Sequence, residues 1–446
     1  MLFRQFVDEG LGCGSYLVGD EHAGVAVVVD PAYAIEPYLE EAARRRVRIE
    51  RVLETHTHAD HVSGHGRLAL ELGAAVAVHP AAEPAFPFEP LEDGAVIEAG
   101  EVALRVVHTP GHRPEHCAFA VSDRSRAEEP WLVLTGDSLL VGDAARPDLA
   151  VEADEGARGL FHSLRRISEL ADGVELYPGH VAGSLCGAAM SSKASSTVGF
   201  ERRFNPTLEL LDEDAFVQAT AGGSQPRPPN MARIVELNRG PFLPAPPELR
   251  PLETRDGATV VDVRTAAAFA DGHVPGAFNI PVAGSSFATR AAFLLSPDER
   301  IALHGSSPEE VERAARGLRS VGFVELAGYL EDPETPDRLE PVALEELEGL
   351  LASGAVELLD VREADERDGG YISGSRHVPY RLVRACGEEL GNGKTVVTIC
   401  ETGSRAAIAA SVLAAAGIDA RPVIYGGLRE WRARGNQTVQ FRRCGT

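Results

Sequence analysis

The sequence predicts a multidomain α/β protein, and three observations carry this prediction. The chain has 446 residues, a length that usually divides into about two to four domains. Short apolar runs of strand length alternate with amphipathic segments of helical period. The C-terminal half also repeats itself, because 258–281 resembles 356–379 and 300–323 resembles 395–418. A repeat of this length indicates two homologous domains of about 100 residues rather than a solenoid unit.

The composition is that of a water-soluble globular protein, with 44% hydrophobic and 25% charged residues. A formal net charge of −24 argues against nucleic acid or an anionic membrane as a partner. No apolar run reaches the ~18 residues that cross a bilayer, and we see no signal peptide. The six cysteines lack paired spacing, which fits a reducing compartment. We therefore expect a cytoplasmic protein, and we also expect a homodimer or homotetramer.

The first 190 residues or so predict alternating strands and helices. Five apolar runs read as strands, namely 25–30, 51–56, 74–79, 102–108 and 131–137. Helices fit between them at 35–46 and 159–170. Several of the predicted strands end on a histidine or an aspartate, and strand ends are where many α/β folds place their sites. Segments rich in Pro and Gly at 222–230 and 240–251 then indicate irregular connections, and the second is a plausible domain boundary.

Seven candidate metal ligands follow these strands in a fixed order. The stretch THTHADH (55–61) holds four of them, and TPGH, LTGD and YPGH each end on one more. A neighbouring glycine lets the backbone turn sharply and bring a ligand inward. Solvated loop histidines would not produce this order by chance. The sequence therefore predicts a metal centre with the candidates His56, His58, Asp60, His61, His112, Asp137 and His180.

This ordered set resembles the metallo-β-lactamase superfamily over roughly residues 1–240. The resemblance implies an αββα sandwich with the metal at one edge of two sheets. In dinuclear zinc hydrolases of the superfamily, such as thioester or lactone hydrolases of the glyoxalase II type, one zinc would be held by His56, His58 and His112. The other zinc would be held by Asp60, His61 and His180, with Asp137 bridging the two.

The persulfide dioxygenase branch of the superfamily implies a different centre. There His56, His112 and Asp137 would hold one Fe(II) per chain, leaving positions open for oxygen and substrate. The remaining four candidates, His58, Asp60, His61 and His180, would orient these ligands and nearby waters. The stretches HADHVSGHG (58–66) and GDSLLVGDAARPDL (136–149) resemble this branch. We see no helical thioester-binding domain of the kind that glyoxalase-type hydrolases add.

Two residues of the second stretch, Arg146 and Asp148, would lie near the thiol carrier in that branch. A guanidinium suits a carrier carboxylate. The alternative for Arg146 is a surface ion pair, and the sequence leaves both interpretations open.

A second candidate site lies in ICETGSRAAIAASVLAAAG (399–417), where Cys400 stands between an apolar strand and a helix. Loop amides, the helix N-terminus and the charge of Arg405 would all favour a thiolate. The six-residue loop CETGSR, together with LLDVRE and GGLREW, resembles the rhodanese family over about 340–440. This resemblance implies sulfurtransferase chemistry, with Cys400 carrying sulfane sulfur and Arg405 assisting. The substrate would lie along the loop residues Glu401, Thr402, Gly403 and Ser404.

The first copy of the repeat departs from this pattern. Its stretch LHGSSPEEV (303–311) has no cysteine, and Gly305 and Glu310 stand where Cys400 and Arg405 stand in the second copy. A carboxylate in place of the anion-binding arginine makes an active site improbable. We therefore expect three domains: a metallo-β-lactamase domain at 1–245, a degenerate rhodanese-like domain at 251–335 and a catalytic rhodanese domain at 340–446.

Two further cysteines lie within the part of the chain that holds the predicted metal centre or just after it. Cys186, in GHVAGSLCG (179–187), could reach the metal pocket, and this string resembles that of fused dioxygenase–rhodanese proteins. We treat Cys186 as a catalytic candidate, with a small buried residue as the alternative. Cys13, in a glycine-rich stretch, reads as structural.

The whole chain resembles a persulfide dioxygenase–rhodanese fusion. This implies oxidation of a low-molecular-weight persulfide by oxygen to sulfite and thiol, coupled to interconversion of sulfite plus sulfane sulfur with thiosulfate, as in sulfide detoxification. The alternatives are a dinuclear zinc hydrolase with an appended sulfurtransferase and a non-catalytic sulfur-carrier scaffold. The sequence leaves open the carrier thiol, the direction of sulfur transfer and any channelling.

Overall fold

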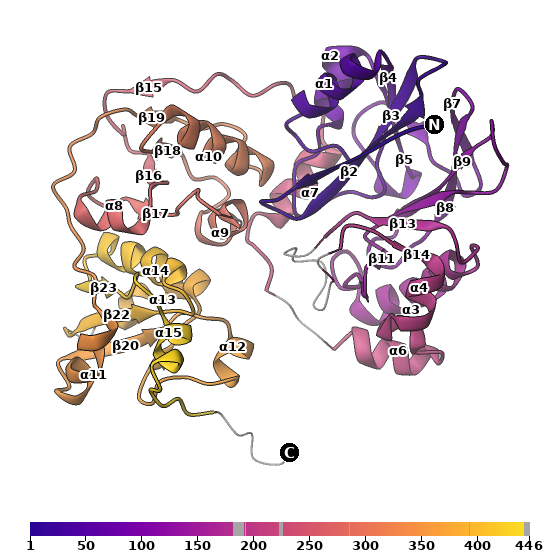
Figure 1. Cartoon of the computed structure of the whole chain (residues 1–446). Coiled ribbons are helices and arrows are strands. Elements are labelled where there is room, and N and C mark those ends of the chain that lie inside the picture. The colour runs from indigo at the N-terminus through magenta and orange to yellow at the C-terminus, as the bar shows by residue number, and fades with distance from the viewer. Residues whose placement is uncertain (182–190, 192, 223–225, 285, 392, 441–446) are drawn as a thin grey trace. The chain divides into compact units, whose positions relative to one another are not determined.

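The structure is a computed structural model of the chain (Figure 1), and it describes residues 1–446 except 182–190, 192, 223–225, 285, 392 and 441–446. The chain forms two compact units. The first comprises Met1–Pro246 with Arg319–Gly322, and the second comprises Pro247–Leu318 and Phe323–Thr446. Within the described ranges, no helix combines the length and the apolar character needed to cross a lipid bilayer.

Two six-stranded sheets form the centre of the first unit, in the orders β1-β2-β3-β4-β5-β6 and β14-β13-β10-β9-β8-β7. The strands of the first sheet are β1 (Leu2–Asp8), β2 (Cys13–Asp20), β3 (Val25–Val29), β4 (Arg48–Leu53), β5 (Ala75–Val78) and β6 (Glu89–Pro90). Those of the second are β7 (Val96–Ala99), β8 (Val102–His108), β9 (Cys117–Asp123), β10 (Leu132–Gly136), β13 (Glu175–Pro178) and β14 (Ser196–Thr197). A small hairpin joins β11 (Leu139–Leu140) to β12 (Asp143–Ala144).

Helices cover the outer face of each sheet. The helices of this unit are α1 (Glu36–Arg45), α2 (His65–Leu72), η1 (Pro80–Ala82), α3 (Ala153–Ser168), α4 (Val198–Phe204), α5 (Pro206–Glu209), α6 (Glu213–Thr220) and α7 (Met231–Arg239). Alternation along β3 shows the layering, because side chains of a strand point to opposite faces in turn. Val28 packs with Tyr38 of α1, whereas Val27 packs with Phe119 of the second sheet. On the far side, Leu164 of α3 packs with Val133. The αββα sandwich predicted from the sequence is confirmed.

The candidate metal ligands follow the ends of four strands that meet at one edge of this sandwich. Strands β4, β8, β10 and β13 end at Leu53, His108, Gly136 and Pro178, a few residues before His56, His112, Asp137 and His180. Strand β4 ends at Leu53, three residues earlier than the predicted strand 51–56, so His56 lies in the loop that follows it. Helix α3 begins earlier than the predicted 159–170, and its first turn is acidic with Asp154 and Glu155, which suits the positive end of the helix dipole.

The second unit contains two sheets whose strand pairs are all parallel, in the orders β15-β19-β18-β16-β17 and β21-β20-β22-β23. The first sheet holds β15 (Pro251–Leu252), β16 (Thr259–Asp262), β17 (Phe278–Asn279), β18 (Ile301–His304) and β19 (Gly328–Leu330). The second holds β20 (Val356–Asp360), β21 (Arg376–His377), β22 (Thr395–Ile399) and β23 (Ala420–Pro422). Strands β16 to β19 correspond in order to β20 to β23. The prediction of two homologous α/β domains with parallel sheets is confirmed.

Helices connect these strands and flank both sheets. They are α8 (Ala266–Asp271), α9 (Phe287–Leu294), α10 (Pro308–Ser320), α11 (Leu344–Ala352), α12 (Ala364–Asp368), η2 (Tyr380–Leu382), α13 (Val383–Leu390), α14 (Ser404–Ala415) and α15 (Leu428–Ala433).

Both copies of the repeat keep the same ion pair at the end of a central strand. In the first copy, Arg264 Nε donates to Asp262 Oδ1 at 2.9 Å, and in the second, Arg362 Nε donates to Asp360 Oδ1 at 3.0 Å. Each arginine also donates to a backbone carbonyl, that of Gly272 or Gly370, at 2.8 Å. Arg362 and Asp360 are fully buried. A buried pair is costly to break because the remaining charge is left without its partner.

We expect Arg362→Met to lower the free energy of unfolding of the C-terminal domain by about 3 kcal/mol, since Arg367 still contacts Asp360 at 3.1 Å. Trp431 lies in this domain, so its fluorescence in a Trp131→Phe background reports on the domain during chemical denaturation. The matched control is Arg376→Met, which removes an arginine that is 39% exposed and pairs with Glu357, and should cost less than about 1 kcal/mol. Equal losses would contradict the prediction.

Candidate metal centre and sulfur-transfer site

The loop that follows β4 carries His56, His58, Asp60 and His61, and buried hydrogen bonds fix its course. Thr55 donates to Asp30 through both its backbone N–H (2.7 Å) and its hydroxyl (2.8 Å). Asn238 of α7 donates to the carbonyl oxygens of His58 (3.0 Å) and His61 (2.8 Å) and accepts from the backbone of Ser63. Sequence reasoning missed Asn238, because a single buried amide on a helix carries no local motif.

Three of the predicted ligands converge on one point. The His56, His112 and Asp137 side chains each offer one ligand atom, and these atoms lie within 4.8 Å of one another. Asp137 Oδ2 is 3.6 Å from His112 Nε2 and 3.9 Å from His56 Nε2. All three residues are buried, and among the described residues Asp137 Oδ2 has no hydrogen-bond partner. An unpartnered buried carboxylate oxygen facing two imidazoles is the arrangement that a metal ion would satisfy.

The two histidines are held in the form that binds a metal. His112 Nδ1 donates to the carbonyl oxygen of Arg146 at 3.0 Å, which leaves the Nε2 lone pair directed at Asp137. His56 Nδ1 lies 2.9 Å from the Thr55 hydroxyl. Burial lowers the pKa of both histidines, and lowers that of His56 well below its ordinary value. Both rings are therefore neutral near pH 7, as metal ligation requires.

Two other histidines hold Asp137 in place. His180 Nδ1 lies 2.7 Å from Asp137 Oδ1, and its Nε2 lies 2.7 Å from Asp60 Oδ2. The Asp137 backbone N–H donates to His116 Nε2 at 2.9 Å. Burial lowers the pKa of His116 to about 3, so this ring stays neutral and can accept. The structure thus gives His116 a positioning contact to a candidate ligand.

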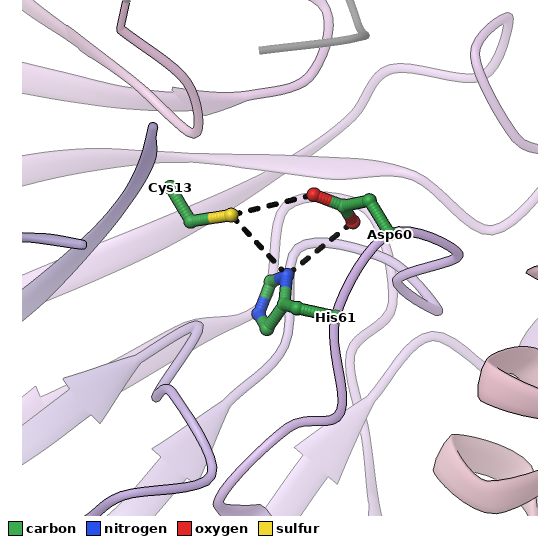
Figure 2. A group of neighbouring side chains, drawn as sticks. All are labelled: Cys13, Asp60 and His61. Atoms are coloured by element: carbon green, nitrogen blue, oxygen red, sulfur yellow. Dashed lines mark hydrogen bonds and ion pairs between the residues drawn. The ribbon is translucent and has the colours of Figure 1, made fainter. Parts of the chain in front are cut away.

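A second group of side chains lies next to the triad. Cys13 Sγ, at the start of β2, is 3.3 Å from Asp60 Oδ2, 3.5 Å from His61 Nδ1 and 3.3 Å from His180 Nε2. Figure 2 shows Cys13, Asp60 and His61 pointing toward one another. Burial raises the pKa of the Cys13 thiol well above its ordinary value. Sequence reasoning missed this placement. The structure shows the close approach at Gly14, where a Cβ would lie 3.0 Å from the carbonyl oxygen of Pro178, the last residue of β13.

His58 lies in a third buried group. Its Nε2 is 3.2 Å from Glu54 Oε2 and 3.3 Å from Asp30 Oδ1. Burial opposes the charged form of this ring, but the two carboxylates raise the pKa of His58 well above its ordinary value. Its Nδ1 has no hydrogen-bond partner among the described residues. The His58 ring also lies 4.2 Å, centroid to centroid, from the rings of His56 and His61, so His58 adjoins the triad as well as this group.

Arg146 is buried and makes a bidentate ion pair with Asp148, with N–O distances of 2.6 and 2.7 Å. Asp148 also accepts from Arg227. The pair is buried, unlike the surface ion pair that the sequence gave as the alternative, and a role of Arg146 toward a thiol carrier stays a prediction. Cys186, which the sequence gave as a catalytic candidate, lies outside the described residues.

The second predicted site lies at the C-terminal end of β22. Cys400 is buried, and the backbone N–H of Gly403 donates to its Sγ at 3.1 Å. Gly403 has a φ of 105° and lies so close to the Ile424 carbonyl oxygen that a Cβ would be 2.5 Å away. Only glycine fits this turn, which aims an amide at the sulfur. Helix α14 begins at the next residue, Ser404.

Arg405 carries a positive charge near Cys400, as expected, but a carboxylate already pairs with it. It makes a bidentate ion pair with Glu366 of α12, with N–O distances of 2.5 and 2.6 Å. Glu401 is paired as well, at 3.3 Å from Arg362 and 3.2 Å from Arg432. A carboxylate from another helix therefore balances the guanidinium in the loop, and the sequence of the loop alone did not reveal it.

In the corresponding loop of the first copy, a side chain of the protein accepts a hydrogen bond from a backbone N–H of the loop. Gly305 follows β18 where Cys400 follows β22. The Glu310 carboxylate, at the position of Arg405, accepts a hydrogen bond from the Ser306 backbone N–H at 2.8 Å. A side-chain anion of the protein itself thus takes a loop amide that could otherwise bind a substrate anion.

Comparison with known families agrees with this division of the chain. The family described as the metallo-β-lactamase superfamily matches residues 9–180, and the family described as the rhodanese-like domain matches 246–332 and 343–434.

Individual relatives extend this result. Persulfide dioxygenase ETHE1 of Homo sapiens is 30% identical over 240 residues, covering 53% of this chain and 87% of that protein. The Bos taurus protein of the same name is 31% identical, covering 55% of this chain and 91% of that protein. A crystal structure of a metallo-β-lactamase from Staphylococcus aureus subsp. aureus COL has a TM-score of 0.68 and 29% identity, covering 74% of this chain and 98% of that chain. The chain therefore belongs to the persulfide dioxygenase family of the metallo-β-lactamase superfamily, in a fusion with two rhodanese-like domains.

Proposed function

We propose that this protein is a non-haem Fe(II) persulfide dioxygenase joined to a rhodanese sulfurtransferase. The observation that carries the proposal is the convergence of His56, His112 and the unpartnered Asp137 Oδ2 in the same chain as the Cys400 loop. The relatives named persulfide dioxygenase support the choice of reaction. We assign the first activity to residues 1–245 and the second to 340–446, with 251–335 as a domain without its own catalytic cysteine.

In the first reaction, a persulfide RSSH, oxygen and water give the thiol RSH, sulfite and protons. A bound Fe(II) would supply the oxygen chemistry and open positions for the substrates. The chain orients the ligands: the Arg146 carbonyl oxygen fixes the ring of His112, and His180 and His116 fix the carboxylate of Asp137. Burial of these groups excludes bulk water from the reacting sulfur.

In the second reaction, the Cys400 thiolate attacks the outer sulfur of thiosulfate. The S–S bond breaks, the electron pair leaves with sulfite, and Cys400 becomes a persulfide. The reverse reaction joins sulfite to the sulfane sulfur of Cys400 and releases thiosulfate. The Gly403 N–H, 3.1 Å from the sulfur, stabilises the thiolate. Sulfite is thus both a product of the first reaction and a substrate of the second. This shared compound explains why the two activities would be joined in one chain.

A dinuclear zinc hydrolase remains the second candidate function. Asp60, His61 and His180 lie beside the triad, where the hydrolases of the superfamily would hold a second zinc. Cys13 contacts all three of these side chains, so a second metal ion would have to displace a buried thiol or use it as a ligand.

Metal content distinguishes the two functions. We expect about one iron per chain, and we expect His112→Ala to weaken iron binding by more than the 10- to 100-fold that loss of an orienting partner costs. His61→Ala is the matched control and should keep the iron, since His61 lies outside the triad. Elemental analysis and oxygen uptake with a glutathione persulfide are the measurements. Two zinc ions per chain, or an iron-loaded protein that consumes no oxygen, would refute the proposal.

Substitution of Cys400 separates the two reactions. We expect Cys400→Ser to reduce sulfur transfer from thiosulfate to cyanide by a factor on the order of 1,000 or more, because it removes the nucleophile. Persulfide-dependent oxygen uptake should stay unchanged. Cys386→Ser, in the same domain but away from the loop, is the control and should keep both activities. Loss of both activities in Cys400→Ser would mean that the two reactions share one cysteine, contrary to the proposal.

A further inference from the structure

Helix α9 of the cysteine-less domain packs against the catalytic rhodanese domain within the second unit. The Phe293 ring of α9 meets the Tyr380 ring of η2 edge-on, with 6.5 Å between ring centroids. Arg384, just after η2, donates to the Leu294 carbonyl oxygen at 3.0 Å and to Glu299 at 2.7 Å. The end of α9 is therefore tied to the segment that begins at Tyr380.

The helix that follows the Cys400 loop is tied to the same domain. Asn279 of β17 donates its backbone N–H to the Ser411 hydroxyl of α14 at 2.9 Å, and both residues are fully buried. Since α14 starts at Ser404, the orientation of the loop depends on this contact as well as on α9. These two contacts place the cysteine-less domain beside the sulfur-transfer site.

Arg290 lies in α9 about one turn before Phe293 and Leu294, two residues that contact the catalytic domain. The charged and titratable groups that act on it are Tyr380, Arg405 and Cys400, all in the catalytic domain, and no carboxylate is among them. Burial lowers the pKa of the Arg290 guanidinium, and burial also raises the pKa of Tyr380 to about 12, so the phenol carries no charge. Among the described residues, the Arg290 guanidinium forms no hydrogen bond or ion pair.

Arg405 and Arg290 differ in whether a carboxylate already pairs with the guanidinium, and this difference decides which of them is available to a substrate anion. The charge of Arg405 also interacts with Cys400, but Glu366 already accepts hydrogen bonds from both arms of its guanidinium. Within the described part of the chain, Arg290 has no such partner. A partly buried guanidinium without a counter-ion, beside a nucleophilic sulfur, fits an anion that arrives with the substrate.

We propose that Arg290 is a substrate-binding residue of the Cys400 site, supplied by the cysteine-less domain, and that it selects small sulfur oxyanions such as thiosulfate and sulfite. This inference rests on the proposed sulfurtransferase function and deepens it by naming a further residue that binds its oxyanion substrates. During transfer, the negative charge that develops on the leaving sulfite stays beside the guanidinium. A neutral organic persulfide would gain nothing from this contact.

Alkylation of Cys400 tests whether the positive charge of Arg290 attracts anions to the sulfur, and it does not require turnover. Iodoacetate is anionic and iodoacetamide is neutral, and mass spectrometry of the Cys400 peptide gives both rates in the full-length protein. We expect Arg290→Gln to lower the ratio of the iodoacetate rate to the iodoacetamide rate about tenfold, the size expected for loss of one charge-assisted contact. Arg290→Lys should retain most of the ratio. Arg316→Gln, which removes an exposed arginine of α10, should leave it unchanged.

Thiosulfate kinetics provide the second measurement. We expect Arg290→Gln to raise the KM for thiosulfate about tenfold, with a smaller effect on the KM for cyanide. An unchanged alkylation ratio, or equal changes with both reagents, would overturn the assignment even if sulfur transfer is normal. A ratio that depends on Arg290 in a protein without thiosulfate exchange would support the anion site while refuting the proposed sulfurtransferase. The two hypotheses can therefore fail separately.

Discussion

The first unit depends on one buried carboxylate, that of Asp137. An ionised carboxylate without solvent is costly unless other groups compensate its charge. His180 meets one oxygen at 2.7 Å, and the other oxygen faces His56 and His112 and has no hydrogen bond within the described part of the chain. Both rings are neutral, so they cannot balance the charge. A cation at this point would, and the strands that end at Gly136 and Pro178 bring the required groups to it.

The layers of the fold and the residues of the triad could be predicted because their signals are local. Alternating apolar residues identify strands, and a histidine or aspartate after a strand and beside a glycine identifies a ligand position. His112 and Asp137 follow this pattern. The repeat likewise predicted two parallel-sheet domains, because Asp262 and Asp360 each end a strand and each bind an arginine two residues later.

Contacts between distant parts of the chain could not be predicted in this way. Asn238 contacts the loop of His58 across a large sequence separation, and Cys13 does the same with Asp60. Neither contact has a period or a motif. The charge of Arg405 illustrates the consequence: the loop sequence predicts an available cation, yet Glu366 on another helix neutralises it. Electrostatics at a site therefore depend on the tertiary structure even where the motif is local.

The two rhodanese-like copies have kept what folding requires and have diverged at the loop. Both retain the buried aspartate–arginine pair, since either partner left alone would destabilise the domain. In the first copy, the Glu310 carboxylate accepts the hydrogen bond of a loop N–H, so this N–H is not available to a substrate anion. A domain released from catalysis can still shape its neighbour's site. Among the described residues, Arg405 has a carboxylate partner and Arg290 has none, so one domain would hold the nucleophile and the other a positive charge open to the substrate.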